Sequence, residues 1–357
     1  SIMVGDDATG TISAANYNTG LGVDVFAALT SGDNNVAVGY NAGAGITTGT
    51  LNTFIGGLAG DATTTASDNT GVGAASMGGN TTGTRNTALG SDSLKVSTEG
   101  NDNTAIGKGS LAANTTASNN TAVGKNSLTA NTTGAQNTAV GQGAGESNTT
   151  GVSLVALGRQ ALEANTEGDF NTALGQRALF KNTTSDNNTA VGNQALGENT
   201  TGARNTAVGA DALDANTTAN NNTAVGRSSL GANTTGTFNT ASGRQALLSN
   251  TTGDNNVAVG GNALYQNTTA DDNTAVGAYS LDANTTGNSN VAVGTSSLSA
   301  NTVGDRSVAV GYNALLVQNP DSNVDMYNVA VGYAAGAAVT TGTNNTLIGG
   351  LAGDAIT

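Results

Sequence analysis

Hydrophobic and polar positions recur along this chain with a period of 17 residues. An aliphatic residue followed by Gly recurs every 17 residues from Gly5 to Gly311, one step of 21 residues leads to Gly332, and a last step of 17 leads to Gly349. These are 21 copies of the pattern N-T-A-V-G-x-x-A/S-L-x-A-N-T-T-G-x-x, and a clean copy runs from Asn120 to Gln136. We number the positions of each copy from this Gly, which is position 0.

The residues before the Gly predict a short strand. Position −1 is Val, Ile or Leu in 20 of the 21 copies, and position −3 is Thr, Val or Ile in all of them. Alternating β-branched residues are typical of a strand on which the −3 and −1 side chains share one face. We expect this face to line the core and to form a valine ladder from turn to turn. Its clearest members are Val123, Val140, Val191, Val208 and Val225.

Two further positions predict buried ladders. Position +4 is Leu in 13 copies, including Leu128, Leu162, Leu179, Leu196 and Leu213. Position +7 is Asn in twelve successive copies, including Asn131, Asn165, Asn182 and Asn199, whose amides could hydrogen-bond from turn to turn. The 36 charged residues (11 basic and 25 acidic) never occupy positions −4 to 0, +3, +4, +7 or +8. We interpret these charge-free positions as buried.

The period selects the architecture. A unit of 17 residues is too short for a two-helix repeat, which needs roughly 33–47 residues, and the abundant Gly, Asn and Thr also disfavour helix. The pattern therefore predicts an all-β fold, a parallel β-solenoid with one turn per copy and one continuous array over residues 1–357. Successive turns would stack about 4.8 Å apart, and the Gly would permit a corner with positive φ.

Position −2, on the other face of the strand, is Ala in 16 copies and Gly in two. A strand whose residues are restricted on both faces is expected to be covered on both faces. We therefore expect a neighbouring chain to pack against the Ala row, and the array to be an intertwined homotrimer. The alternative is a single-chain solenoid in which Ala merely suits a tight coil. The expected inter-chain face contains Ala122, Ala139, Ala190, Ala207 and Ala224.

Two interruptions depart from the pattern. Residues 312–331 contain a four-residue insertion, which is either a contact loop for another domain or a receptor, or a tolerated surface loop. The contact residues would be Leu316, Val317, Pro320, Asp321, Met326 and Tyr327. Residues 39–62 and 332–355 nearly duplicate each other, with Gly at +4 and a large residue at −2. They suggest boundary modules with a changed cross-section, or a recent duplication without structural consequence.

Composition and charge narrow the function further. The chain has no Cys and no His, which excludes disulfides, zinc fingers, thiolate nucleophiles and imidazole bases. Its net charge of −14 argues against nucleic acid and anionic membranes as partners, and no apolar run approaches the ~20 residues of a membrane span. The acidic residues are scattered over corner positions, so we expect no catalytic residues, no metal and no cofactor. We also expect the chain to be a segment of a longer protein, or a mature product whose ends abut something else, because the array ends mid-turn at Thr357 and neither end has an obvious cap.

The strand motif also carries a resemblance. N-T-A-V-G, with the variants N-V-A-V-G at 256–260 and S-V-A-V-G at 307–311, resembles the S-V-A-I-G core of trimeric autotransporter adhesin heads. The longer form N-T-A-V-G-x-x-A-L-x-x-N-T-T-G is similar to repeats of phage tail fibres and bacterial surface fibres. The resemblance implies left-handed parallel β-rolls made of three intertwined chains. It also implies a structural fibre segment, a shaft or head, on the virion or cell surface, with other copies and a cell-surface glycan or receptor as partners.

Two other functions remain open at this stage. The chain could be the subunit of a self-assembling extracellular filament, in which open ends stack subunit on subunit. It could also bind ice, because Thr pairs at positions +8 and +9 run through many successive copies and would form regular ladders. The simpler interpretation of these pairs is that one Thr caps the turn and the other packs.

Overall fold

The computed structural model describes residues 2–5 and 14–356 of the chain. These residues form an all-β parallel β-solenoid of about 20 turns of ~17 residues, and no helix occurs among them. The predicted fold class is therefore confirmed. The chain divides into two compact units, residues 1–184 and 185–357, which are described separately below. The homotrimer and the single continuous array stay predictions.

Each strand has three residues and occupies positions −3 to −1 of its copy. The strands of the first unit are β1 (Ile2–Val4), β2 (Thr19–Leu21), β3 (Val36–Val38), β4 (Thr53–Ile55), β5 (Thr70–Val72), β6 (Thr87–Leu89), β7 (Thr104–Ile106), β8 (Thr121–Val123), β9 (Thr138–Val140), β10 (Val155–Leu157) and β11 (Thr172–Leu174). Those of the second unit are β12 (Thr189–Val191), β13 (Thr206–Val208), β14 (Thr223–Val225), β15 (Thr240–Ser242), β16 (Val257–Val259), β17 (Thr274–Val276), β18 (Val291–Val293), β19 (Val308–Val310), β20 (Val329–Val331) and β21 (Thr346–Ile348).

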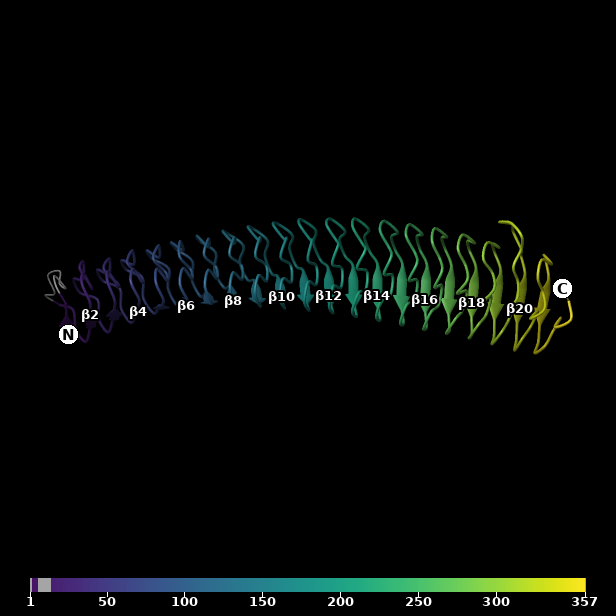
Figure 1. The fold of residues 1–357 in the computed structure, drawn as a ribbon, viewed down its shortest axis with the longest axis horizontal. Coiled ribbons are helices and arrows are strands. Elements are labelled where there is room, and N and C mark those ends of the chain that lie inside the picture. The colour runs from purple at the N-terminus through teal and green to yellow at the C-terminus, as the bar shows by residue number, and fades with distance from the viewer. Residues whose placement is uncertain (1, 6–13, 357) are drawn as a thin grey trace. The chain divides into compact units, whose positions relative to one another are not determined.

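Within each unit, consecutive strands lie side by side in chain order and pair in parallel (Figure 1). Equivalent residues face each other, so Val123 of β8 pairs with Val140 of β9. The four-residue insertion does not disturb this register, because Val308 of β19 still pairs with its equivalent Val329 of β20. The insertion is therefore absorbed between the strands.

The conserved Gly forms the corner that ends each strand. At position 0 its φ lies between 124° and 156° in every copy, a region that residues with a Cβ rarely adopt. A Cβ added to Gly124 would also lie 2.5 Å from the carbonyl oxygen of Gly141 in the next turn. Both the conformation and the close stacking of turns thus require Gly, as the sequence predicted.

The Ala row lies inside the chain, not between chains. Ala122, Ala139, Ala190, Ala207 and Ala224 are all at most 1% exposed in a single copy. The expectation that they form an inter-chain face was therefore wrong. The physical reason is the narrow cross-section, since position −2 faces the Leu at +4 across the interior. Beside a Leu there is room for a methyl group and little more.

The opposite face of each strand points outward. Val123, Val140 and Val191 are half-buried, while Val208 and Val225 are 36% and 40% exposed. The valine ladder exists in parallel register, but the expectation that it lines the core was wrong. The interpretation of charge-free positions as buried holds for −4, −2, +3, +4 and +7 and fails for −3 and −1, while positions 0 and +8 are only partly buried. Leu128, Leu162, Leu179, Leu196 and Leu213 are fully buried, as predicted.

In each of the two near-duplicate stretches, a large residue at position −2 lies opposite a Gly at position +4. A Cβ added to Gly60, at position +4, would lie 2.5 Å from the ring of Phe54, at position −2. In the second unit a Cβ on Gly353 would lie 2.7 Å from Leu347. The large −2 residue thus fills the space that a missing +4 Leu leaves. This corrects the expectation of a changed cross-section, and the role of these stretches as boundary modules stays a prediction.

This contact predicts that two substitutions that each destabilise the protein compensate each other when combined. Gly60→Leu should lower the free energy of unfolding by about 1–3 kcal/mol through overpacking, and Phe54→Ala by about 3–5 kcal/mol through a cavity. The double variant restores the consensus pair, so its loss should be smaller than the sum of the single losses by more than about 1 kcal/mol. Denaturant unfolding of the four proteins measures this. Additive losses would contradict the proposed contact between positions −2 and +4.

The interior Ala row predicts a second result. Ala207→Leu should lower the free energy of unfolding by about 1–3 kcal/mol, and the loss should not depend on protein concentration because the crowding lies within one chain. Ala210→Leu, at the partly exposed position +1 of the same copy, is the matched control and should change stability by less than about 0.5 kcal/mol. Equal effects of the two substitutions, measured by denaturant unfolding, would place Ala207 outside the core.

Candidate functional site

The Asn residues at position +7 form a buried hydrogen-bonded ladder. Nδ2 of Asn148 donates to Oδ1 of Asn131 at 2.8 Å, and Nδ2 of Asn165 donates to Oδ1 of Asn148 at 2.9 Å. Asn165 Nδ2 also donates to the carbonyl oxygen of Gly168 at 3.0 Å. The ladder continues with Asn182 in the first unit and includes Asn199 in the second. The predicted Asn ladder is confirmed, and it is structural because its amides are buried and paired.

A second Asn ladder, at position −4, was not predicted. The backbone N–H of Asn137 donates to Oδ1 of Asn120 at 2.9 Å, and Nδ2 of Asn137 donates to the carbonyl oxygen of Gly151 at 2.8 Å. This row is also buried. The signal was present in the sequence, because Asn opens the consensus and no charge occurs at −4. Turns with Asn at both positions therefore carry two inward amides.

The Thr pairs at +8 and +9 have two different roles. The hydroxyl of Thr132, at +8, donates to the carbonyl oxygen of Thr149 in the next turn at 3.0 Å. Thr133 and Thr150, at +9, are exposed to solvent. One Thr of each pair thus holds the turn, as the simpler interpretation expected, while the other faces outward instead of packing.

The most unusual surface is the outward strand face, which we define as the side chains at positions −3 and −1. Leu89 and Leu157 in the first unit are 42% and 45% exposed, and Val225 and Val259 in the second are 40% and 39% exposed. No charged residue occurs at these positions in any copy. Position −1 is aliphatic in 20 of the 21 copies, whereas position −3 is Thr in 14 of them. Parallel sheets are ordinarily covered on both faces, and a contiguous row of exposed aliphatic side chains commonly marks an interaction site. This face is therefore the candidate functional site.

Two rows of charge flank the outward strand face. Among the described residues, every charge at position +1, just after the strand, is basic. These residues are Lys108, Lys125, Arg159, Arg227 and Arg244. Every charge at position +11, before the strand, is acidic: Asp33, Asp169, Asp186, Asp254, Asp271 and Asp305. In the described part of the chain the neighbouring positions carry both signs, with three Asp and one Arg at +2 and three Asp and three Arg at +12. The side after the strand is therefore predominantly basic and the side before it predominantly acidic; we call these the basic edge and the acidic edge.

The acidic edge also has a structural role. Oδ1 of Asp254 accepts the backbone N–H of Thr237 at 2.6 Å, and Oδ1 of Asp271 accepts that of Asp254 at 2.7 Å. Asn288 continues the row, accepting the backbone N–H of Asp271 at 2.8 Å. Position +11 therefore favours short side chains with a carboxyl or amide oxygen, which explains part of its acidity without a ligand.

The predicted contact loop is only partly available for contact. Pro320 and Met326 are buried, and a Cβ on Gly304 would meet both, so the expectation that they contact a partner was wrong. Met326 fills the interior because the longer loop folds back over the turn. Val317, Asp321 and Tyr327 are exposed and Leu316 is half-buried. A receptor-binding role for these four residues stays a prediction.

The insertion is anchored at both ends. Gln318 replaces Asn at position +7, and its longer side chain donates from Nε2 to Ser307 Oγ at 2.9 Å and to Asn301 Oδ1 at 3.3 Å. On the surface, the hydroxyl of Tyr327 donates to Oδ2 of Asp325 at 2.9 Å, and Arg306 pairs with the same carboxylate. The loop is therefore held by the ladder inside and by an ion pair outside.

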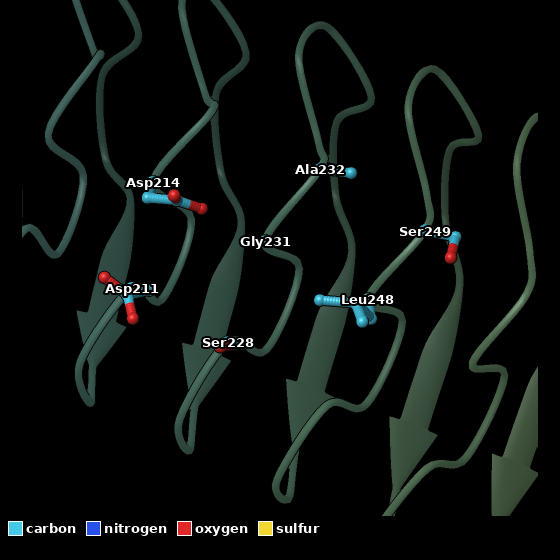
Figure 2. Close-up of a pocket in the computed structure, with 7 residues that line it drawn as sticks. All are labelled: Asp211, Asp214, Ser228, Gly231, Ala232, Leu248 and Ser249. Carbon is cyan, nitrogen blue, oxygen red and sulfur yellow. The ribbon is translucent and has the colours of Figure 1, made fainter.

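A shallow depression in the second unit holds two carboxylates. Figure 2 shows Asp211 and Asp214 on one turn, Gly231 on the next and Leu248 on the third. The hollow exists because Gly231 contributes no side chain at a position where its neighbours have larger ones. Burial, then the charge of Asp211 and, more weakly, that of Glu198 raise the pKa of the Asp214 carboxyl above its ordinary value of 3.8.

Searches for two other kinds of site gave negative results. The described part of the chain contains no group of three or more acidic residues placed to hold a metal ion. No helix among the described residues is long and apolar enough to span a membrane.

The comparisons with known proteins give no relative. No protein-family model matches the chain, and the curated proteins contain no match either. The resemblance to adhesin heads and tail fibres thus rests on the repeat motif alone, while the solenoid fold rests on the structure.

The position of Asp214 predicts a pH effect. Because its pKa is raised in the folded state, the folded protein binds this proton more tightly than the unfolded chain, so ionised Asp214 weakens the fold at neutral pH. Asp214→Asn should therefore stabilise the protein at about pH 7 and give no gain at about pH 3, where the carboxyl is protonated in both states. Denaturant unfolding at the two pH values measures this, and an equal gain at both would refute it.

Proposed function

We propose that this chain is a structural fibre segment, the shaft or head of a phage tail fibre or bacterial surface adhesin, that provides reach and rigidity for attachment. The observation that carries the proposal is the ladder bonding. Within each unit every strand pairs with the next turn, and from Asn114 to Asn301 the buried Asn row at +7 runs beside the row at −4. A unit built in this way resists bending and unravelling because its bonds repeat at every turn.

The proposal includes self-association as a homotrimer on the virion or cell surface. The single chain closes its own core, so copies would meet through their outer surfaces and need not share an interior. The outward strand face supports such association because its −1 row is aliphatic in 20 of the 21 copies and neither of its partly exposed rows carries a charge. Exposed corner residues repeated along several copies would then contact a glycan or receptor many times, and weak contacts would add up through multivalency.

The oligomeric state of the purified chain tests this proposal. Sedimentation and negative-stain images should show discrete particles of about three chains, because the proposed association closes around a common axis. Polymers of unbounded length would favour the self-assembling filament instead. Single chains at all concentrations would overturn the proposal.

A further inference from the structure

We propose that the outward strand face is the surface on which copies of this chain pack, and that neighbouring copies point in the same direction along the stack of turns. The inference rests on the self-association in the proposed function and names its surface and polarity. The outward strand face takes the place of the Ala row as the proposed surface between chains, because the structure buries the Ala row inside each chain.

The absence of charged residues from the outward strand face indicates that another molecule covers it. Exposed positions elsewhere accept charge, since Glu99 and Glu167 replace Thr at the exposed position +9 and position +12 carries six charges of both signs. Val225 and Leu157, at position −1, are at least as exposed as many charged corners, and yet that row carries no charge in any copy. If only water met the face, its rows would tolerate Lys or Glu as position +9 does. Burying an unpaired charge is strongly unfavourable, which explains the exclusion if a partner covers these residues.

The repeat identifies the partner as another copy. The face presents the same two rows once per turn, about 4.8 Å apart. A partner can meet it at every turn only if its own groups recur with the same spacing, and a second copy of this chain does so without any further adjustment. Nucleic acid and anionic lipid are disfavoured by the net charge of −14.

The two charged edges determine the direction. When two copies face each other and point the same way, the basic edge of each, containing Arg227 and Arg244, lies along the acidic edge of the other, containing Asp254 and Asp271. When they point in opposite ways, basic edge meets basic edge and acidic meets acidic. Opposite potentials attract and like potentials repel across an interface. The parallel arrangement is therefore favoured, whatever the number of copies around the axis.

A charge on the face tests the surface. Val123→Asp places a carboxylate on the outward strand face, where the side chain is half-buried in one chain, so the fold should be retained and the circular dichroism unchanged. We expect assembly to weaken at least about tenfold in sedimentation, equivalent to about 1.4 kcal/mol. Thr133→Asp, at the exposed position +9 of the same copy, is the matched control and should assemble like the native chain.

Spin labels test the direction. The chain has no Cys, so Thr53→Cys and Thr172→Cys each give one labelling site on the outward strand face of the first unit. The two sites lie seven turns apart, roughly 34 Å at about 4.8 Å per turn. In a parallel assembly both variants should give the same short distance between copies by pulsed electron paramagnetic resonance. In an antiparallel assembly the two distances cannot both be short.

The outcomes separate this inference from the proposed function. Single chains for the native protein would overturn both. Native assemblies that survive Val123→Asp, or that give unequal or long distances for the two labels, would overturn the inference and leave the fibre proposal intact. Dissociation by Val123→Asp together with two equal short distances would support surface and direction.

Discussion

The buried Asn amides are the groups on which the rest of the structure depends. Each of them must find a donor and an acceptor inside the chain, because an unpaired buried amide costs about 1–3 kcal/mol. Asn148 does so by bonding both to Asn131 and to the backbone at Gly151, and Asn165 repeats the arrangement one turn later. Such bonds form only if equivalent residues stack directly, so the amides require a constant period and parallel strands. Where the period changes, Gln318 with its longer side chain replaces Asn.

A narrow interior follows from this stacking, and it explains the residue sizes. A typical turn directs inward two amides, one Leu, the Ala at −2 and a small Ala or Ser at +3, so positions −2 and +4 share a limited volume. Phe54 opposite Gly60 and Leu347 opposite Gly353 keep that volume with the sizes reversed. The interior is thus complete within one chain, and the apolar residues at −3 and −1 are left for the surface. This is the physical origin of the outward strand face.

The period, the strands, the Gly corner, the Leu row and the Asn row at +7 could all be predicted from the sequence, because each depends only on recurrence and residue type. The direction of the strand faces could not, since alternation is symmetric and the Val, Leu and Ile at −1 are more apolar than Ala122 or Ala207. Hydrophobicity therefore indicated the wrong face of the strand as the buried one, whereas the restriction of position −2 to small residues indicated the buried face correctly. Met326 was misjudged for a related reason, because the sequence of a loop does not show which residue folds back inside.

The central claim is that one chain closes its own core around the row that contains Ala122. Thiol labelling of Ala122→Cys and Lys125→Cys tests it directly, since no native Cys interferes. At a dilution where sedimentation shows single chains, the thiol at 125 should react at the rate of an exposed corner. The thiol at 122 should stay protected until the chain unfolds, because it is buried without any partner. Rapid labelling of Cys at 122 in folded single chains would contradict the account.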